Sequence, residues 1–470
     1  MRSFYVATPI YYANDKPHVG HAYTTVAADV LARYWAGRLG AEQVFFLTGT
    51  DEHGQKIAEA AARAGLEPKA YVDTQVPKFE RAWQALGVQP SIFMRTTDPE
   101  HEAFAASFLQ RLFDRGDVYK GAYDGVYCVG CEAYKTETEL QDGRCPDHPN
   151  LTPERRTEEN YFFKLTAYVP RVIEAIESGA MKVEPTMRRN EVLARLKGEV
   201  RDISISRPGL SWGVPLPWDN SHTAYVWVEA LLNYLSALEK VGRTELWPAN
   251  VQLMGKEILW FHAGIWPALL LAGGYALPEQ VFAHGWFTVD GQKMSKTVGN
   301  VVDPIELAEE WGTDAARYFL LSAVPFGADG DIQKARFAEI YVADLANSLG
   351  NLLHRTVTLI RRAELVVEPE LDVRLGRADE AIEAMRLDEG LKEIWAVVRE
   401  ANKAIEDARP WLLMKDPARR TELEAALVGA YRALEAIAAG LAPYLPETSA
   451  KILAQLQGGD LVPLFLRKDV

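Results

Sequence analysis

Two pieces of the N-terminal stretch decide the fold class: FYVATPIYYANDKPHVGH at residues 4–21 and VFFLTGTDEHG at residues 44–54. The apolar runs at 4–7 and 44–47 predict buried strands, and apolar residues at helical spacing predict a helix over 18–39. A second helix is predicted over 57–64. Strands that alternate with helices are typical of a doubly wound parallel sheet, whose ligands bind at the carboxyl ends of the strands.

The sequence pattern that predicts secondary structure changes twice along the rest of the chain. Short aromatic and β-branched runs with many Gly and Pro predict a partly β insertion at 116–222, between α/β segments at 1–115 and 223–330. The second α/β segment contains predicted strands at 251–254 and 281–289 and a predicted helix at 257–272. Residues 331–470 have a helical pattern, with an apolar seam over 423–441 behind a predicted capping box of Thr421 and Glu424, and therefore predict a helix bundle.

Composition excludes several classes of protein. No apolar run approaches the roughly 20 residues of a membrane span, and residues 1–9 contain no secretory signal, so we expect a cytoplasmic protein without membrane contact. The net charge of −14, from 51 Lys+Arg and 65 Asp+Glu, argues as an average against a nucleic-acid partner. However, residues 188–201 contain five basic residues and only two acidic ones, and such a local basic segment suffices for phosphate contacts.

The sequence PHVGH at 17–21 lies where the first strand leads into the first helix. Backbone N–H groups and the positive end of the helix dipole face an incoming anion there. The imidazoles of His18 and His21 can donate to phosphate oxygens, while Gly20 lets a nucleotide approach the backbone. Two ordinary surface histidines at a helix start are the alternative explanation.

A second polar stretch, DGQKMSKT at 290–297, contains two lysines that flank Met and Ser. Lys293 and Lys296 can neutralise the growing charge of a triphosphate, although a solvated basic loop is the alternative. The chain contains neither G-x-x-x-x-G-K-[ST] nor G-x-G-x-x-G, which disfavours a P-loop ATPase and a conventional dinucleotide enzyme.

All three cysteines lie within 18 consecutive positions and are followed by a histidine at matching spacing. The pattern C-x2-C-x13-C-x2-H is typical of two knuckles that close a tetrahedral zinc site. Four protein ligands leave no position for water, so we predict one structural zinc ion. Its ligands are Cys128, Cys131, Cys145 and His148.

These motifs resemble those of the class I aminoacyl-tRNA synthetases. HVGH at 18–21 and KMSKT at 293–297 are similar to the signatures HIGH and KMSKS of that class, with Val19 and Thr297 as the variants. TPIYYAN at 8–14, SISR at 204–207, WG at 212–213, YVW at 225–227, GKEI at 255–258 and the zinc knuckle resemble the methionyl-tRNA synthetase family of bacterial type. The segment between the α/β parts, about one hundred residues, has room for one small domain but not for a separate editing domain.

The resemblance implies a Rossmann-like catalytic domain split by the zinc-knuckle insertion and followed by an α-helix bundle. It also implies a methionine:tRNA ligase that makes methionyl-adenylate and pyrophosphate from L-methionine and ATP with magnesium. The methionyl group would then pass to the terminal adenosine of tRNA(Met), including the initiator tRNA. Another class I synthetase, or a synthetase-derived RNA-binding protein without catalysis, is the alternative, and a homodimer is expected only if the full-length protein has a further C-terminal domain.

The resemblance assigns residues as well. Those that would bind ATP are His18, Gly20, His21, Glu257, Lys293, Ser295 and Lys296, with the two histidines and two lysines as the catalytic groups. Those that would bind methionine are Ile10, Tyr12, Asp51, Trp227, Ala230, Tyr234, Ile258, His262 and Trp266, with Asp51 on the ammonium group. Those that would read the CAU anticodon are Asn351, Arg355, Pro410 and Trp411. Core packing is the alternative for each aromatic residue.

Overall fold

The computed structural model describes residues 2–130, 133–135, 140–146, 149–293, 300–370, 373–466 and 468. The chain forms two compact units. The first contains Met1–Lys16, Phe45–Glu80 and Pro90–Ala283, and the second contains Pro17–Val44, Arg81–Gln89 and His284–Val470. Within the described ranges, no helix has the length and apolar character needed to cross a membrane.

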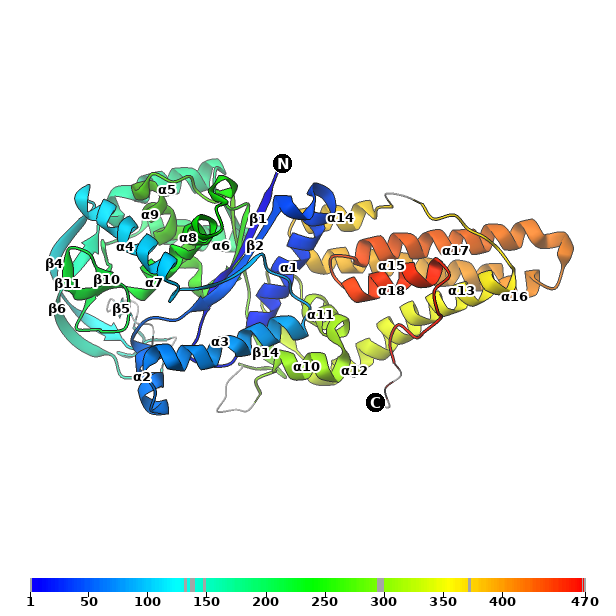
Figure 1. The fold of residues 1–470 in the computed structure, drawn as a ribbon, viewed down its shortest axis with the longest axis horizontal. Helices are drawn as coiled ribbons and strands as arrows, with labels where there is room; N and C mark the ends of the chain where they lie inside the picture. Colours follow the sequence, from blue (N-terminus) through cyan, green and yellow to red (C-terminus); the bar gives the residue numbers. More distant parts are fainter. Residues whose placement is uncertain are drawn as a thin grey trace. The chain divides into compact units, whose positions relative to one another are not determined.

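A six-stranded sheet forms the centre of the first unit, in the order β3-β2-β1-β12-β13-β7. Its registered pairs are parallel, with Val6 opposite Val251 and Leu47 opposite Ile92, which confirms the predicted α/β fold. The two N-terminal strands, in blue in Figure 1, extend beyond the predicted runs, and the residues that follow those runs are also largely buried. The bounds are β1 Phe4–Tyr12, β2 Val44–Asp51, β3 Ile92–Arg95, β7 Lys182–Glu184, β12 Val251–Gly255 and β13 Gln280–His284.

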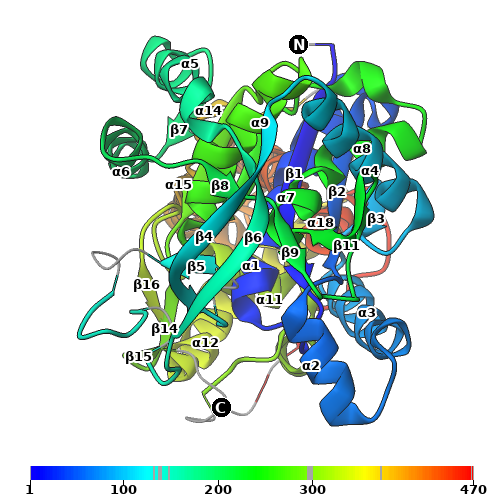
Figure 2. The same ribbon diagram turned by 90° about the vertical axis from the view of Figure 1, so that its left-hand side faces the viewer.

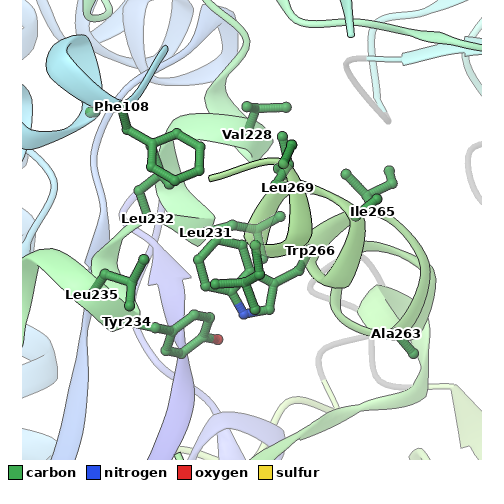
Figure 3. Close-up of a cluster of buried hydrophobic side chains, with 14 of the residues drawn as sticks. Phe108, Val228, Leu231, Leu232, Tyr234, Leu235, Ala263, Ile265, Trp266 and Leu269 are labelled. Atoms are coloured by element: carbon green, nitrogen blue, oxygen red, sulfur yellow. The ribbon is translucent and has the colours of Figure 1, made fainter. Parts of the chain in front are cut away.

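Helices α4 to α9 share one apolar core, part of which Figure 3 shows around Trp266, whereas Ile57 and Val72 belong to a separate small cluster. The helix predicted over 257–272 is divided into a 3-10 turn (Lys256–Ile258), a π-helical turn (Phe261–Ile265) and α9 (Trp266–Gly273). Pro267 lacks an N–H and cannot continue the α-helical hydrogen bonds at this point, which explains the division. The other helices are α2 Gln55–Ala64, α3 Pro68–Ala85, α4 Pro99–Asp114, α5 Leu165–Ser178, α6 Thr186–Lys197, α7 Val226–Leu231 and α8 Asn233–Lys240.

The insertion is partly β, as predicted. Strands β4 (Val118–Cys128) and β6 (Glu154–Phe163) form the long antiparallel pair of Figure 2, flanked by β5 (Ala133–Lys135) and β8 (Ile203–Ser204). A smaller sheet contains β9 Ser206–Pro208, β10 Pro215–Leu216 and β11 Asp219–Ala224. The same segment also supplies β7, the edge strand of the central sheet beside β13. The four-part division at 115, 222 and 330 stays a prediction.

The second unit contains α1 (Val19–Leu39) and a small sheet of β15 (Gln292–Lys293), β14 (Phe287–Val289) and β16 (Gly330–Ile332). The single strand predicted over 281–289 is wrong, because β13 ends at His284 and β14 belongs to a different sheet. Gly285 lies between the two strands and allows the chain to pass close to the backbone of Ala328 and Asp329, which a Cβ would overlap. Helices α10 (Pro304–Trp311) and α11 (Thr313–Ser322) follow.

A helix bundle completes this unit, as predicted (Figure 1). The apolar seam of α17 is buried at Leu423, Leu427 and Leu434. The capping box was wrong: α17 begins at Arg420, so Thr421 lies inside it and Glu424 accepts a hydrogen bond from Arg420 at 2.7 Å. The bounds are α12 Lys334–Ile340, a π-helical segment Tyr341–Gly350, α13 Asn351–Arg362, α14 Gly376–Glu383, α15 Leu387–Ala408, α16 Pro410–Leu413, α17 Arg420–Leu441 and α18 Pro446–Leu456.

A buried ion pair links the helices of the second unit. Arg317 of α11 is fully buried, and its Nη2 lies 2.8 Å from Oδ2 of Asp29 on α1. Arg33 also donates to Asp29, at 2.6 Å. The Arg317 guanidinium satisfies three backbone carbonyls, those of Leu86, Pro443 and Tyr444. Such complete pairing is what makes a buried charge tolerable.

We predict that Asp29→Asn lowers the free energy of unfolding by about 3–5 kcal/mol, because Arg317 then keeps a buried charge without a counter-ion. Urea denaturation measures this change. Glu422→Gln is the control, since it breaks an exposed ion pair with Arg419 and should leave the free energy of unfolding essentially unchanged. Equal effects of the two substitutions would contradict the role of the buried pair.

Candidate active site

His18 and His21 form a reciprocal cap at the start of α1. His18 is the N-cap residue, and its Nδ1 accepts a hydrogen bond from the Gly20 N–H at 3.1 Å. The His18 N–H in turn donates to Nδ1 of His21 at 3.3 Å. The two rings stack with centroids 3.8 Å apart. The structure therefore brings these residues together as predicted and fixes both ring orientations.

This geometry determines what the rings offer to a ligand. Because both Nδ1 atoms accept hydrogen bonds, we assign the proton of each neutral ring to Nε2. Burial, and next the cost of placing two positive charges on adjacent rings, hold the pKa of His21 well below its usual value. His21 is thus neutral at pH 7, and two Nε2–H donors stand at the N-terminal end of a helix, where anions bind favourably.

A hydrogen bond that the sequence did not reveal ties α1 to the end of β13 within the second unit. Thr24 Oγ1 lies 2.7 Å from Nε2 of His284, whose Nδ1 lies 2.8 Å from the Gly285 carbonyl. The chain then continues through β14 into β15, where the backbone of Lys293 pairs with Thr288. The side chain of Lys293 and residues 294–299, which include Ser295 and Lys296, lie outside the described part.

In the first unit, Tyr234 and His262 form the best-defined part of the predicted methionine pocket. Nδ1 of His262 lies 3.0 Å from the Ile258 carbonyl and therefore carries the proton. Its Nε2 accepts a hydrogen bond from the Tyr234 hydroxyl, with an oxygen–nitrogen distance of 2.8 Å. Burial lowers the pKa of His262 to about 4, so the pair is neutral. The O–H of Tyr234 is therefore already used as a hydrogen-bond donor to His262.

Aromatic rings and small side chains surround this pair. Trp266 is fully buried with its ring centroid 6.0 Å from that of Tyr234, and Figure 3 shows both rings in the same cluster. Trp227 stacks on Phe261 at 4.7 Å and is only half-buried. Ala230 is buried on α7. Three other predicted pocket residues are partly exposed, as expected of side chains that line a ligand pocket: Ile10, Tyr12 and Ile258.

Asp51, the predicted partner of the substrate ammonium group, is buried as the last residue of β2. Its carbonyl accepts a hydrogen bond from Ala13 N–H at 2.9 Å, and the Tyr12 hydroxyl donates to the His53 carbonyl at 2.9 Å. The ends of β1 and β2 are thereby joined at the carboxyl edge of the parallel sheet. This is where such a sheet is expected to bind its ligand.

Glu257 is exposed on the 3-10 turn after β12. Its carboxylate occupies the space next to the Gly255 α-carbon, where any Cβ would overlap it. The absence of a Cβ at this position leaves room for the carboxylate to lie against the backbone.

A buried carboxylate that sequence reasoning missed lies behind Asp51. Glu229 of α7 is fully buried, with Oε1 2.9 Å from Nδ1 of His53 and Oε2 2.8 Å from Nε2 of His101. His101 also lies 2.8 Å from the Ser236 hydroxyl. A single glutamate inside the apolar run VWVEAL at 226–231 was the available signal.

The charges of this cluster are strongly coupled. Burial alone would lower the pKa of His53, but the charge of Glu229, hydrogen bonds to Glu102 and Glu229, and the charge of Asp51 raise it to about 10. Burial would raise the pKa of Glu229, but His53 and His101 lower it. His53 is therefore a buried imidazolium between two carboxylates.

The predicted anticodon residues lie on two neighbouring parts of the bundle. Asn351 is exposed on α13, where Arg355 donates to Glu406 at 2.9 Å and to Asn402 at 3.2 Å. Pro410 is buried at the start of α16, and Trp411 is 36% exposed. The contacts of Arg355 with α15 bring it to the helix that leads directly into the Pro410–Trp411 turn.

The basic segment at 188–201 offers less charge than the sequence indicated. Arg188 is buried and lies 2.6 Å from Glu191, while Lys197 lies 2.6 Å from Glu177. Arg201 is paired with Glu199, and the Arg195 guanidinium covers the Trp260 ring. Counting residues along the chain could not reveal partners such as Glu177, which lies outside the counted window.

Half of the predicted zinc knuckle lies outside the described residues, namely Cys131 and His148. The other two predicted ligands, Cys128 and Cys145, are buried. Within the described ranges no three metal-binding side chains gather, which is consistent with only two of the four ligands being described. Buried thiols suit a structural zinc site.

Comparison with known proteins adds the class and the family. The family model "tRNA synthetases class I (M)" matches residues 4–151 and 147–357. The methionine–tRNA ligase of Caldanaerobacter subterraneus subsp. tengcongensis is 43% identical over 474 residues, which cover 97% of this chain and 74% of that protein. The corresponding ligase of Synechocystis sp. is also 43% identical, with 97% and 89% covered.

A solved structure agrees. Mycobacterium tuberculosis methionyl-tRNA synthetase in complex with methionyl-adenylate is similar with a TM-score of 0.90 and 34% identity, covering 100% of this chain and 99% of that one. The chain belongs to the class I tRNA synthetases and, among them, to the methionine–tRNA ligases.

The raised pKa of His53 predicts a specific pH dependence of stability. Folded His53 holds its proton up to about pH 10, whereas the unfolded chain loses it near 6.5. The stabilisation is therefore complete below pH 6.5 and falls as the pH rises toward 10. We expect the stability difference between wild type and His53→Gln to shrink by roughly 1 kcal/mol per pH unit between pH 7 and 9.

Urea denaturation at each pH measures this difference. His354→Gln, at an exposed position on α13, is the control and should show no such trend. A difference for His53→Gln that stays constant from pH 6 to 9 would contradict the buried imidazolium.

Proposed function

We propose that this chain is a methionine:tRNA ligase, in which the histidine and lysine loops of the second unit bind ATP and the pocket around Tyr234 in the first unit binds methionine. The likeness over the whole chain to a synthetase in complex with methionyl-adenylate is the observation that carries the proposal. The substrates are ATP with magnesium, L-methionine and tRNA(Met), the initiator tRNA included. The proposed location is the cytoplasm, and a homodimer is proposed only for a full-length protein with a further C-terminal domain.

The pocket chemistry suits a thioether. Methionine is long, unbranched and polarisable, and it fits an apolar aromatic wall with few polar groups. Because the O–H of Tyr234 donates its hydrogen bond to His262, Tyr234 offers the ligand an acceptor oxygen and an aromatic ring but no hydrogen-bond donor. Trp227, Ala230 and Trp266 supply the apolar surface, and Ile10, Tyr12 and Ile258 complete it.

Glu229 connects the two ends of the methionine site and acts as a positioning residue. It shares α7 with Trp227 and Ala230, and its carboxylate holds His53, two residues after Asp51. The charges alternate from Glu229 to His53 to Asp51 and then to the substrate ammonium group. Each neighbour therefore stabilises the next, and Asp51 is kept at a fixed distance from the side-chain pocket.

Adenylation requires no protein nucleophile. The methionine carboxylate attacks the α-phosphorus of ATP, a new oxygen–phosphorus bond forms, and pyrophosphate leaves with the electrons of the broken bond. The Nε2–H donors of His18 and His21 hold the phosphates, Lys293 and Lys296 neutralise the charge of the leaving group, and the Ser295 hydroxyl can donate a hydrogen bond to ATP. Gly20 admits the adenosine, and Glu257 accepts hydrogen bonds from the ribose hydroxyls. Positioning supplies much of the rate.

Amino-acid-dependent ATP–pyrophosphate exchange tests this function. We expect exchange with methionine and none with leucine, isoleucine or cysteine. Lys296→Ala should lower the exchange rate while methionine binding is kept, because the lysine acts on pyrophosphate. Exchange with another amino acid but not with methionine would refute the assignment, and unfolding of Lys296→Ala would make that lysine structural.

Asn351, Arg355, Pro410 and Trp411 are proposed to read the anticodon, with Trp411 as the stacking platform. Trp411→Ala should weaken tRNA charging roughly tenfold, because loss of one stacked base costs about 1–3 kcal/mol, and leave pyrophosphate exchange unchanged. Leu412→Ala is a matched control, since Leu412 is the next residue and is similarly exposed. Equal loss of charging and exchange in Trp411→Ala would contradict the role.

Cys128, Cys131, Cys145 and His148 are proposed to hold one structural zinc ion, which would pin the small insertion. Metal analysis of freshly purified protein should give one zinc per chain, and Cys145→Ser should lose it and unfold at a lower temperature. Protein that is folded and free of zinc as isolated would refute the site.

A further inference from the structure

A cavity of about 200 Å³ lies within the second unit, between α11, α12, the π-helical segment and α15. It is separate in sequence from every residue proposed above for ATP, methionine, zinc or the anticodon. Five charged side chains contribute to its lining: Arg336, Asp344, Asp388, Lys392 and Arg399.

The two acidic groups of the lining already have partners. Asp388 accepts hydrogen bonds from the Phe326 N–H at 2.9 Å and from Lys392 at 2.6 Å. Asp344 accepts a hydrogen bond from the Tyr318 hydroxyl at 2.9 Å. The carboxylates therefore leave little demand for a bound cation.

Donors, in contrast, exceed acceptors. The side chains of Arg336 and Arg399 form no hydrogen bond or ion pair with any described residue. The Nε1–H of Trp395 and the hydroxyl of Ser322 are shielded from solvent, and neither has a partner in the described part of the chain. Trp395 is 4% exposed, and an indole N–H buried without an acceptor costs about 1–3 kcal/mol. This excess indicates a ligand that accepts hydrogen bonds.

Size and charge narrow the class of ligand. The cavity holds the volume of about seven water molecules at ~30 Å³ each, below the ~300 Å³ at which drug-sized pockets begin. It therefore suits a phosphate group rather than a nucleotide. Tyr318 and Trp395 stack on each other with ring centroids 4.4 Å apart. Three cations and two carboxylates give a net charge of 3 − 2 = +1, which one phosphodiester balances.

We propose that this cavity binds a backbone phosphodiester of the RNA substrate. The proposal rests on the proposed function, which supplies the RNA. Arg399 lies on α15 seven residues before Glu406, about 10 Å along the helix, and Glu406 holds Arg355 of the proposed anticodon face. The cavity and that face therefore share a helix. Multiply charged free anions are disfavoured, because they would leave excess negative charge beside Asp344 and Asp388.

Binding of a tRNA(Met) transcript at several NaCl concentrations tests the proposal. Arg399→Gln and Arg336→Gln should each weaken binding about three- to tenfold and reduce the slope of log K against log salt by about 0.7–0.9. Trp395→Phe should weaken binding while it keeps the stacked rings. Arg399→Lys should retain the salt slope. Arg377→Gln, an exposed arginine of α14, is the control and should change neither quantity.

Thermal unfolding confirms that each variant is folded. Unchanged tRNA affinity and slope in both glutamine variants would overturn the proposal. Binding of inorganic phosphate can be followed by tryptophan fluorescence. Saturable phosphate binding that Arg399→Gln abolishes, without any change in tRNA affinity, would also overturn the proposal, because the ligand of the cavity would then be a free anion. Methionine-dependent pyrophosphate exchange distinguishes failure of the proposed function from failure of the cavity proposal. Absence of exchange in the wild type refutes the proposed function. If all variants exchange normally, an unchanged tRNA affinity refutes only the phosphate site in the cavity.

Discussion

The carboxylate of Glu229 is fully buried between two imidazoles, and the proposed methionine site depends on that contact. A buried carboxylate is costly unless each of its oxygens is paired. Here pairing requires a protonated His53 from the loop after β2 and His101 from the start of α4. The segments that carry Asp51 and Trp227 are held together as a consequence, and the distance between the ammonium and side-chain parts of the site follows from it.

The second unit uses the same principle in a different place. Arg317 and Asp29 form a buried pair whose remaining donors reach three backbone carbonyls. Asp29 is on α1, the helix that begins with the two capping histidines, so the orientation of the proposed phosphate-binding end depends on this pair. In both units a charge that would be unfavourable alone selects one arrangement of helices.

Much of this architecture was predictable from local patterns. The parallel sheet, the inserted β segment and the helix bundle follow from apolar periodicity, and the two histidines follow from their place between strand and helix. The failures have physical causes that local patterns do not contain. Pro267 divides a helix, the chain passes against the backbone of Ala328 and Asp329 at Gly285 before it enters another sheet, and Glu424 pairs with Arg420 instead of capping α17.

The missed site residues are joined by contacts between distant parts of the chain. Glu229 lies 176 residues from His53 and 128 from His101, so no spacing rule connects them. The same is true of the phosphate-sized cavity, whose unpartnered donors become visible only when α11, α12 and α15 are packed. A lone acid in an apolar run marked Glu229 as unusual, but its partners required the tertiary structure.

Titration calorimetry of methionine binding to Glu229→Gln tests the central claim most directly. Glu102→Gln is the matched control, because Glu102 also faces His53, at 3.4 Å, but is 44% exposed. We expect Glu229→Gln to weaken methionine binding by about tenfold or more with ATP binding retained, since it removes the charge that holds the buried imidazolium, and Glu102→Gln to have little effect. A folded Glu229→Gln protein that binds methionine as tightly as wild type would contradict the account.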